Sequence, residues 1–433
     1  MENEKQLVFW ILQTGEPLPI DKDFSRPMRA VNLSNKLLEK GHKVVLWSSR
    51  FNHQTKEHRT NDYKKFSNNE NFEIRLIPSC GYKKNISIKR LVDHAQLAYN
   101  LHKILKKEKY HPDIAFLGFP PIEVNFVMSS WLSKRKIPFV VDVKDLWPDV
   151  FVENLIGWKK KIAKFFLFHY YFATKKIYRQ ATALTTITNS FLRYIENFSN
   201  RKSSQLNKVF PLVSNLKLEN DNQDLAEKWL DEIGAHNDNT FRVVYVGNLY
   251  SNIDLSEVKK AAQSFKEKNS NVQFVICGNG EYLPIFKNMM KDLDNVIFPG
   301  PINKNKVSVL AKRSNVWLLP YLNKENFRLS LPNKTYDALY FGIPLFSSLE
   351  GEVKNLIIEN EVGMFYDKIN SLEKCLTKLQ NNNELQKSMS NNGKKLYDEK
   401  FEFNKVYDTF VSYLENTVIK KNDWYQKNRT ASK

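Results

Sequence analysis

The chain of 433 residues is poor in cysteine and has no long apolar run. Its three cysteines (Cys80, Cys277 and Cys375) are too widely spaced to indicate a metal-ligand pair or a disulfide framework, which favours a reducing compartment. No stretch of 18 apolar residues predicts a membrane-spanning helix. The short apolar run at 7–12 fits a first strand better than a signal peptide, so we expect a cytoplasmic protein.

Several catalytic motifs are also missing. The sequence has no G-x-x-x-x-G-K-[ST] phosphate loop, no G-x-S-x-G nucleophile elbow and no H-E-x-x-H metal helix. Two Asp-x-Asp triplets occur, Asp21-Lys22-Asp23 and Asp292-Leu293-Asp294. The second precedes a predicted strand and the first has no strand before it, so both are interpreted as solvated turn carboxylates. We therefore expect neither a metal nor a cofactor.

Hydrophobic residues make up 42% of the chain and aromatic residues 13%, which excludes a disordered protein. The net charge of +19 calls for an anionic partner: nucleic acid, lipid headgroups or a phosphorylated substrate. Residues 1–200 hold 33 basic and 19 acidic side chains, whereas 201–433 hold 33 and 28. This asymmetry indicates two halves with different partners.

The sharpest basic cluster lies at 157–180, where aromatic residues recur at helical spacing. Its lysines include Lys159, Lys160, Lys161 and Lys164. A helix of this kind can lie flat in a membrane surface, with lysines on the headgroups and rings at the acyl boundary. The alternative is a packed surface helix with a solvated basic face.

Short apolar or β-branched runs alternate with helical patterns along the chain, which predicts an α/β fold with two doubly wound Rossmann-like domains. We expect an N-terminal domain at 1–205, a C-terminal domain at 206–400, and a terminal helix with a polar tail at 401–433 that packs back toward the N-terminal domain. The alternation of predicted strands and helices is interrupted by a polar region at 215–239. An Asn-rich patch at 380–392 is interpreted as a loop. Two such domains would face a central cleft at the carboxyl ends of their strands.

The segment 330–348 is the most informative. Pro332 and Asn333 mark a helix start, and Gly342 marks its end. Lys334 in the first turn suits a diphosphate, and Asp337 one turn later suits ribose hydroxyls, unless it only complements the helix dipole. Elsewhere, Gly278-Asn279-Gly280 follows a strand without the third glycine of a dinucleotide fingerprint, which favours a tight turn that faces a phosphate.

These residues resemble the donor-site motif of retaining GT-B glycosyltransferases of family 4, P-[SN]-K-x-[FY]-[ED]-Y-x-x-x-G-x-P. The match runs from Pro332 through Asp337 to Pro344. Further ordered segments resemble the family's bacterial surface-polysaccharide branch, which includes N-acetylfucosamine transferases of O-antigen and capsule assembly: Gly15-Glu16-Pro17, Arg29-Ala30, Gly41-His42, Ser49-x-Phe51-x-His53, 142–149, Tyr245-Val246-Gly247-Asn248-Leu249, 274–280 and Phe298-Pro299-Gly300-Pro301-Ile302.

The resemblance implies roles for particular residues. Lys334 would contact the diphosphate as the main catalytic group, and Asp145 would contact the acceptor or the donor sugar, with a helix N-cap as its alternative role. The donor site would further comprise Gly15, Gly247, Asn248, Gly278, Gly280, Ile302, Arg328, Pro332, Asn333 and Asp337. Glu16, Lys144 and the four lysines of 159–164 would serve the acceptor or the membrane.

The chain departs from the family pattern at two places. Leu329 stands where the family has the first Glu of its E-x7-E pair, and Glu325 is the nearest acid. Asn248 stands at the place of an Arg that usually contacts the diphosphate, which shifts that duty toward Lys334 and Arg328.

The resemblance predicts transfer of a sugar, N-acetylated in the related enzymes, from a UDP-sugar to a polyprenyl-pyrophosphate-linked acceptor. The reaction would retain the anomeric configuration, without a metal, on the inner face of a bacterial plasma membrane. One alternative is a UDP-sugar 2-epimerase of the same architecture, which would need no membrane. The other is a non-enzymatic nucleic-acid-binding protein, although no recognised binding module is present and we expect no nucleic-acid partner.

Overall fold

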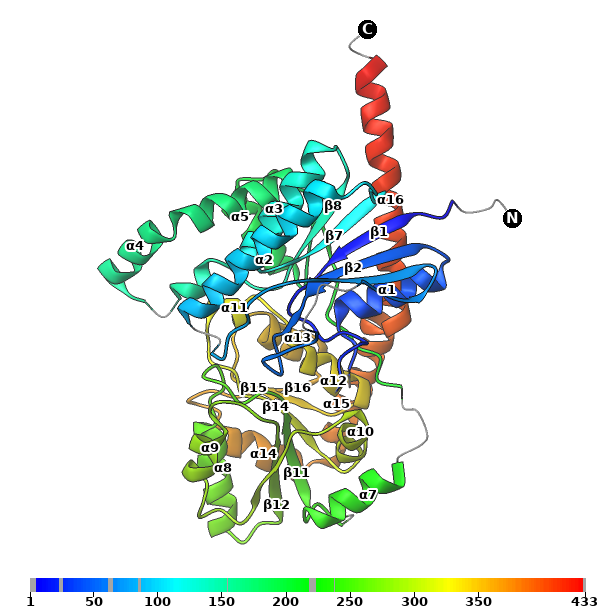
Figure 1. Cartoon of the computed structure of the whole chain (residues 1–433). Helices are drawn as coiled ribbons and strands as arrows, with labels where there is room; N and C mark the ends of the chain where they lie inside the picture. The colour runs from blue at the N-terminus through cyan, green and yellow to red at the C-terminus, as the bar shows by residue number, and fades with distance from the viewer. Residues whose placement is uncertain are drawn as a thin grey trace. The chain divides into compact units, whose positions relative to one another are not determined.

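The computed structural model describes residues 5–22, 26–60, 65–84, 87–153, 155–217, 223–236 and 238–430. Asp23 and part of the expected polar region at 215–239 lie outside these ranges. The chain divides into two compact units (Figure 1). Unit 1 comprises Met1–Pro211 and Asn404–Lys433, and unit 2 comprises Leu212–Phe403. The chain therefore leaves unit 1 near residue 211 and returns to it near residue 404.

Unit 1 is built on one twisted, mainly parallel sheet with the strand order β10-β9-β8-β7-β1-β2-β6-β5, in which only the edge pair β5–β6 is antiparallel. Its central strands are buried along nearly their whole length, as expected for apolar strands covered on both faces. The strands of this sheet are β1 (Val8–Leu12), β2 (Lys43–Ser49), β5 (Lys65–Asn69), β6 (Phe72–Ile77), β7 (Ile114–Phe119), β8 (Phe139–Val143), β9 (Ala183–Thr186) and β10 (Lys208–Val209). A separate hairpin pairs β3 (Phe51–Asn52) with β4 (Glu57–His58).

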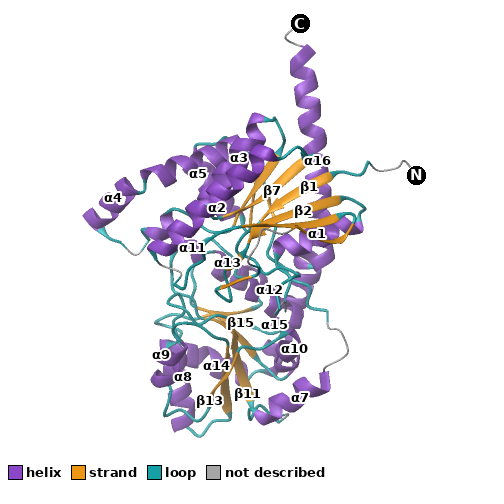
Figure 2. Ribbon diagram, in the orientation of Figure 1, coloured by secondary structure: helices purple, strands orange, loops and turns teal. Residues whose placement is uncertain are grey.

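Helices cover both faces of this sheet (Figure 2). They are α1 (Arg29–Glu39), α2 (Ile88–Lys107), α3 (Ile122–Lys134), α4 (Gly157–Phe166), α5 (Phe168–Gln180), α6 (Asn189–Ser199) and the terminal α16 (Phe403–Thr430), with a 3-10 turn at Asp149–Phe151. Helices α2, α3 and α5 pack against one another on one face, and α1 and α16 lie on the other. The Phe410 ring of α16 stacks on Phe210 at 3.8 Å between centroids, and the Tyr413 hydroxyl donates to the Leu206 carbonyl at 2.7 Å.

Unit 2 has a fully parallel sheet of order β13-β12-β11-β14-β15-β16. Its strands are β11 (Phe241–Val246), β12 (Val272–Cys277), β13 (Val296–Gly300), β14 (Val316–Leu319), β15 (Leu345–Ser347) and β16 (Gly363–Phe365). Its helices are α7 (Gln223–Glu232), α8 (Ser256–Glu267), α9 (Leu283–Met289), α10 (Lys304–Lys312), α11 (Glu325–Arg328), α12 (Asn333–Phe341), α13 (Glu352–Asn360), α14 (Leu372–Gln380) and α15 (Asn383–Leu396), the last continued by a π-helical turn at Tyr397–Phe401.

These two sheets confirm the predicted fold class of two doubly wound Rossmann-like domains. In each sheet the strand order reverses once, between β1 and β7 in unit 1 and between β11 and β14 in unit 2. Ligands of open α/β sheets bind beyond the carboxyl ends of the strands at such a reversal. The carboxyl edge of each sheet is therefore where functional residues are sought.

The predicted loop at 380–392 is wrong, because most of it forms helix α15. The Asn382 side chain caps this helix by accepting a hydrogen bond from the Leu385 amide at 2.9 Å. Met389, Gly393 and Leu396 form its buried face at spacings of four and three residues. An asparagine costs only about 0.7 kcal/mol in a helix, so this packing outweighs the composition on which the loop was predicted.

The basic aromatic segment at 157–180 is also not one helix. It forms α4 and α5, separated at Leu167, whose φ and ψ of −91° and 8° interrupt the helix. Asp149 holds this region in place by accepting hydrogen bonds from the hydroxyls of Tyr171 and Tyr194, both at 2.8 Å. Helix α5 is thereby anchored to unit 1, while α4 has no buried residue.

Candidate functional site

The strongest candidate site lies at the carboxyl edge of the unit 2 sheet, where loops follow β11, β12 and β14. Helix α12 starts after the N-cap residue Pro332 and ends at Gly342, whose φ of 66° suits glycine. The predicted limits of this helix are therefore confirmed. Pro332 provides no side-chain cap to the first turn. Amide groups at such a helix start are suited to an anion.

Lys334 projects from the first turn of α12 across the loop after β11. Its Nζ donates to the Tyr321 hydroxyl at 3.2 Å and lies 5.9 Å from the ring centroids of Tyr245 and Tyr321. A Cβ added at Gly247 would lie 1.9 Å from Lys334 Cε. Gly247 therefore leaves the space that the lysine side chain fills.

Tyr245 fixes the loop that Lys334 crosses. Its hydroxyl donates to the Asn248 carbonyl at 2.8 Å, and burial raises the pKa of Tyr245 well above its usual range. The phenol therefore stays protonated and remains a hydrogen-bond donor. Asn248 itself is exposed at the end of this loop.

Gly278 and Gly280 have a packing role that the sequence did not indicate. A Cβ at Gly278 would lie 1.8 Å from the Gly247 carbonyl oxygen, and one at Gly280 would lie 2.3 Å from that of Leu249. Both glycines have positive φ, 144° and 156°. The loops after β11 and β12 thus pack backbone against backbone, and the Leu249 amide donates to the Asn279 carbonyl at 2.9 Å. These glycines are needed for the loop geometry whether or not a ligand is bound.

The other expected donor-site residues differ in exposure. Asp337 is 4% exposed, whereas Lys334, Asn333, Pro332 and Ile302 are half-buried. Glu325 and Arg328 are exposed on the short helix α11, after β14. Among the charged donor-site residues, Lys334 is the one whose side chain contacts Tyr321 and lies over Gly247 in the loop after β11.

In unit 1, the corresponding edge carries the residues expected for the acceptor. Glu16 is 5% exposed; its carboxylate accepts from the Ala30 amide at the start of α1, at 2.9 Å, and forms an ion pair with Lys144. The two charges expected for acceptor contact are therefore paired with each other. Gly15 is exposed beside them.

Asp145 follows Lys144 at the end of β8 and is half-buried. No helix starts there: its carbonyl accepts from the Trp147 amide at 2.9 Å, and the next element is the 3-10 turn whose N-cap is Pro148. The N-cap role considered for Asp145 is therefore wrong. Asp21 also differs from expectation, since its carboxylate is buried against Arg59 at 2.6 Å instead of being solvated.

Among the expected membrane-facing lysines, Lys159 and Lys161 are exposed on α4 and Lys160 is half-buried. Lys164 pairs with Asp149 at 3.3 Å. Within the described ranges, no helix combines the length and apolar character needed to cross a membrane. The same residues hold no group of three or more His, Cys, Asp or Glu side chains arranged to bind a metal ion.

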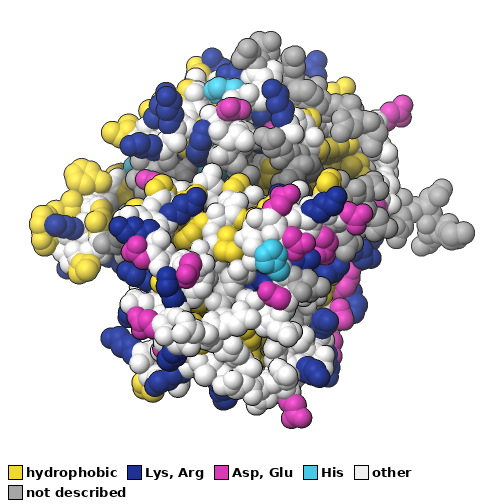
Figure 3. Space-filling view, turned by 90° about the horizontal axis from the view of Figure 1, so that it is seen from below, with side chains coloured by type: hydrophobic (Ala, Val, Ile, Leu, Met, Phe, Trp, Pro, Cys, Tyr) yellow, Lys and Arg dark blue, Asp and Glu magenta, His cyan; other side chains and the backbone are white. Residues whose placement is uncertain are grey.

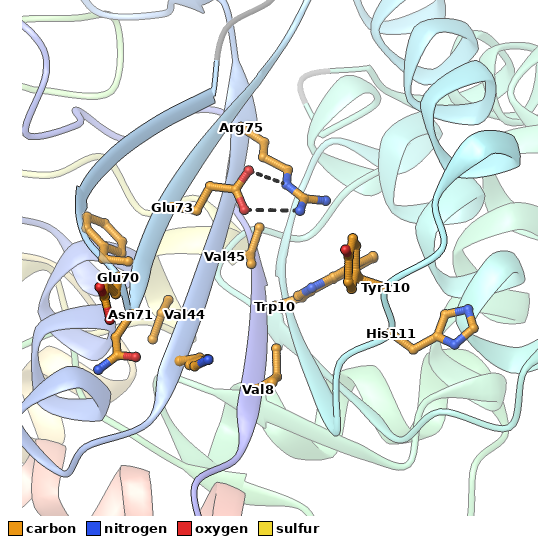
Figure 4. A pocket seen from close by; sticks show the side chains of 12 residues that line it. Val8, Trp10, Val44, Val45, Glu70, Asn71, Glu73, Arg75, Tyr110 and His111 are labelled. Carbon is orange, nitrogen blue, oxygen red and sulfur yellow. Dashed lines mark hydrogen bonds and ion pairs between the residues drawn. The ribbon is translucent and has the colours of Figure 1, made fainter.

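A cavity of about 550 Å³ lies elsewhere in unit 1 (Figure 4). Trp10 and Val45 line it, and Arg75, paired with Glu73 at 2.9 Å, lies at its side. Its lining includes Val8, Lys43 and Phe72, at the amino-terminal starts of β1, β2 and β6. It therefore lies at the amino-terminal end of these strands, opposite the unit 1 edge that carries Glu16 and Lys144.

Comparisons with known proteins bear on the family and the fold. Residues 228–396 match the family described as Glycosyl transferases group 1. No curated protein matches the chain. Solved structures that resemble it include sucrose-phosphate synthase from Thermosynechococcus elongatus, with 14% identity, a TM-score of 0.66 and coverage of 99% of this chain and 100% of that one. WaaG, a glycosyltransferase involved in lipopolysaccharide biosynthesis, has 14% identity, a TM-score of 0.62 and coverage of 94% and 99%.

A third similar structure is that of Anabaena HepE in complex with UDP and glucose, with 11% identity, a TM-score of 0.63 and coverage of 95% and 100%. These likenesses establish the GT-B fold of the whole chain. The range that matches the group 1 glycosyltransferase model lies within unit 2 and contains both Gly247 and Lys334.

Proposed function

We propose that the protein is a retaining glycosyltransferase that moves a sugar from a UDP-sugar to a lipid-linked saccharide acceptor in bacterial surface-polysaccharide biosynthesis. The observation that carries the proposal is Lys334, placed over Gly247 at the strand-order reversal of a glycosyltransferase group 1 domain. UDP bound to HepE, and UDP-2-fluoro glucose in the trehalose-6-phosphate structure from E. coli, support a uridine nucleotide as the donor.

The proposed chemistry breaks the bond between the sugar anomeric carbon and the UDP β-phosphate oxygen and forms a bond to an acceptor hydroxyl. The acceptor proton passes to the departing phosphate, so little general-base catalysis is needed. Negative charge grows on the phosphate oxygens in the transition state. The Lys334 ammonium and the amides at the start of α12 would stabilise that charge, and losing one such donor typically costs about 10²–10³-fold in rate.

Asp337 is proposed to hold the ribose, and Asp145 to contact the acceptor or the donor sugar. Gly15, Asn248, Ile302, Arg328 and Asn333 would complete the donor surroundings. The reaction is proposed to need neither metal nor cofactor, because Lys334 and the amides would supply the positive charge. Glu325 is exposed on α11 and is the acid proposed to replace the missing first Glu of the family pair.

The acceptor is proposed to be presented at the inner face of the plasma membrane. Exposed aromatic side chains on α4 and at the start of α5 support this proposal: Trp158 is 68% exposed, Phe165 72% and Phe166 71%. Figure 3 shows hydrophobic side chains gathered with basic ones on this projecting part of unit 1. A 2-epimerase of the same fold would have no use for such a surface, and nucleic-acid binding would not explain its rings.

Thermal unfolding with and without UDP tests the proposal. A ligand at 100 times its Kd stabilises a protein by about 2.7 kcal/mol, which corresponds to a rise of roughly 5–10 °C in Tm for a unit of this size. We expect UDP and UDP-sugars to give such a rise, and Lys334→Ala to remove most of it.

The matched control is Lys312→Ala, which removes an exposed lysine of α10 in the same unit. It should leave the UDP effect intact. Absence of any UDP effect on the unaltered protein, or an undiminished effect in Lys334→Ala, would contradict the proposal.

A further inference from the structure

Basic and aromatic side chains also meet at another place on the carboxyl edge of the unit 1 sheet. We call His53, Lys56, Tyr82 and Arg90 the hairpin cluster. His53 and Lys56 belong to the turn between β3 and β4, Tyr82 follows β6, and Arg90 lies in the first turn of α2. Segments far apart in the sequence thus bring these groups to one place.

The contacts within the hairpin cluster are short. Lys56 Nζ lies 3.5 Å from His53 Nδ1 and 4.7 Å from the Tyr82 ring centroid. The Arg90 guanidinium lies 5.6 Å from the Tyr82 ring and 5.1 Å from that of Trp147, which follows β8. One phenol ring therefore has two cations beside it.

Electrostatics show that these positive charges oppose one another. Burial and the charge of Arg90 lower the pKa of Lys56 to about 8. Burial, with the charges of Lys56 and Arg90, lowers the pKa of His53 to about 3. Two carboxylates are nearby: Asp93 accepts from the Gly81 amide at 2.6 Å and its charge also acts on Tyr82, and Glu123 accepts from the Tyr170 hydroxyl at 2.7 Å. An anion entering the hairpin cluster would relieve this repulsion.

The backbone at Lys56 supports the same conclusion. Its φ of 63° lies in the left-handed region, which glycine adopts most easily. The turn holds it there, because the Lys56 amide donates to the Asn52 carbonyl at 3.0 Å and the Asn52 side chain accepts from the Gln54 amide at 2.9 Å. These hydrogen bonds therefore hold Lys56 in its place in the hairpin cluster.

We propose that the hairpin cluster binds the phosphate or diphosphate group of the acceptor. This rests on the proposed function, because it assigns the anionic end of the acceptor to unit 1. Arginine recognises phosphate through paired N–H donors and lysine through its point charge. The position also fits, since the cluster follows β2 and β6 at the edge where ligands of such sheets bind.

Calorimetric titration tests the site with three probes: inorganic phosphate, inorganic pyrophosphate and farnesyl diphosphate. UDP is kept in excess throughout so that the unit 2 site is occupied. The variants are Lys56→Gly, which suits the backbone at that position, and Arg90→Gln. Each should weaken binding of the preferred probe at least tenfold. Lys89→Gln, which removes an exposed charge next to Arg90, should change it less than twofold.

The probes also distinguish the source of the anion. Tighter binding of farnesyl diphosphate than of pyrophosphate supports a lipid-linked acceptor, and preference for inorganic phosphate supports a phosphorylated sugar. Binding that neither Lys56→Gly nor Arg90→Gln weakens, or no binding of any probe, overturns the proposed site.

Two further measurements separate this proposal from the proposed function. The Lys334→Ala variant should lose the UDP-induced rise in Tm but still bind the anion, and adding Arg90→Gln to it should weaken that anion binding. Arg90→Gln alone should keep the UDP-induced rise in Tm. If UDP does not raise the Tm of any variant while anion binding is weakened by changes at Lys56 and Arg90, the proposed function fails and the anion site stands.

The second measurement is the Tm without ligand. It should stay unchanged or rise in Lys56→Gly, because a repelling charge is removed. A Tm drop together with unchanged anion binding would assign Lys56 a structural role and overturn the proposal.

Discussion

Gly247 shows how much one missing side chain decides at the candidate donor site. An added methyl group would lie 1.9 Å from Lys334 Cε and 3.0 Å from the Tyr245 hydroxyl. Real Cβ atoms essentially never approach as closely as 1.9 Å, and Lys334 is the flexible partner in this contact. The lysine would therefore move, and the loop after β11 would keep its position.

We expect Gly247→Ala to remove most of the UDP-induced rise in Tm while leaving the ligand-free Tm within a few degrees. The physical reason is that the Nζ atom would no longer lie between Tyr245 and Tyr321. Thermal unfolding over a UDP titration measures both quantities.

Gly393→Ala is the control for Gly247→Ala, because its Cβ would meet only Leu339 at 3.5 Å within helix α15. It should raise stability by about 0.5–1 kcal/mol through helix propensity and leave UDP binding unchanged. If UDP raises the Tm of Gly247→Ala as much as that of the natural protein, Lys334 does not need its present position for UDP binding.

At the scale of elements, α4 is unusual because none of its residues is buried. Its rings Trp158, Phe165 and Phe166 are largely exposed, so replacing them should leave stability nearly unchanged. The same replacement would remove what an interfacial helix inserts into a lipid surface.

We therefore expect the triple variant Trp158→Ser, Phe165→Ser, Phe166→Ser to lose sedimentation with vesicles of anionic lipid, with less than about 0.5 kcal/mol change in unfolding free energy. Changing Lys159 and Lys161 to Glu should reduce the fraction of protein that sediments with the vesicles. It should also reduce the dependence of that fraction on salt concentration. Ile358→Ser, at an isoleucine 57% exposed on α13, controls for general loss of apolar surface. Failure of the natural protein to sediment would refute the membrane proposal.

The sequence predicted elements well where their signals are local. Helix α12 was found from Pro332 and Gly342, because a cap depends on neighbouring residues. Helix α15 was missed because its buried face depends on packing against α12, which composition does not reveal.

The hairpin cluster was missed for a related reason. His53, Tyr82 and Arg90 meet only through strand order, and no spacing along the chain indicates the contact. Tyr321, which orients Lys334, was missed likewise. The break at Leu167 has no proline or glycine to mark it.

At the scale of the whole molecule, one buried ion pair lies where the chain leaves unit 1 and where it returns to it. Arg29 and Asp142 are 2.7 Å apart, with side chains 1% and 0% exposed. Arg29 also donates to the Phe210 carbonyl, and its guanidinium lies 5.5 Å from the Phe410 ring. This residue thus links α1 and β8 with the segments by which the chain leaves unit 1 and returns to it.

We expect Arg29→Met to destabilise unit 1 by about 3–5 kcal/mol, because the Asp142 charge would remain buried without its partner. In this variant, UDP should still stabilise unit 2 at temperatures where unit 1 remains folded. Denaturant unfolding measures the loss of stability, and calorimetry with UDP measures the stabilisation of unit 2. Adding Asp142→Asn should restore part of the loss, and Arg193→Ala, at an exposed arginine of α6, should cost less than about 0.5 kcal/mol. A loss below 1 kcal/mol in Arg29→Met would refute this role.

The closure of unit 1 by α16 sets an order of events during protein synthesis. Phe410 and Tyr413 pack on Phe210 and Leu206, yet they are made only after all of unit 2 has been translated. Unit 2 is continuous and can fold as it leaves the ribosome, whereas unit 1 must wait with the contact surface for α16 uncovered. The half that is made first is therefore the half that is finished last.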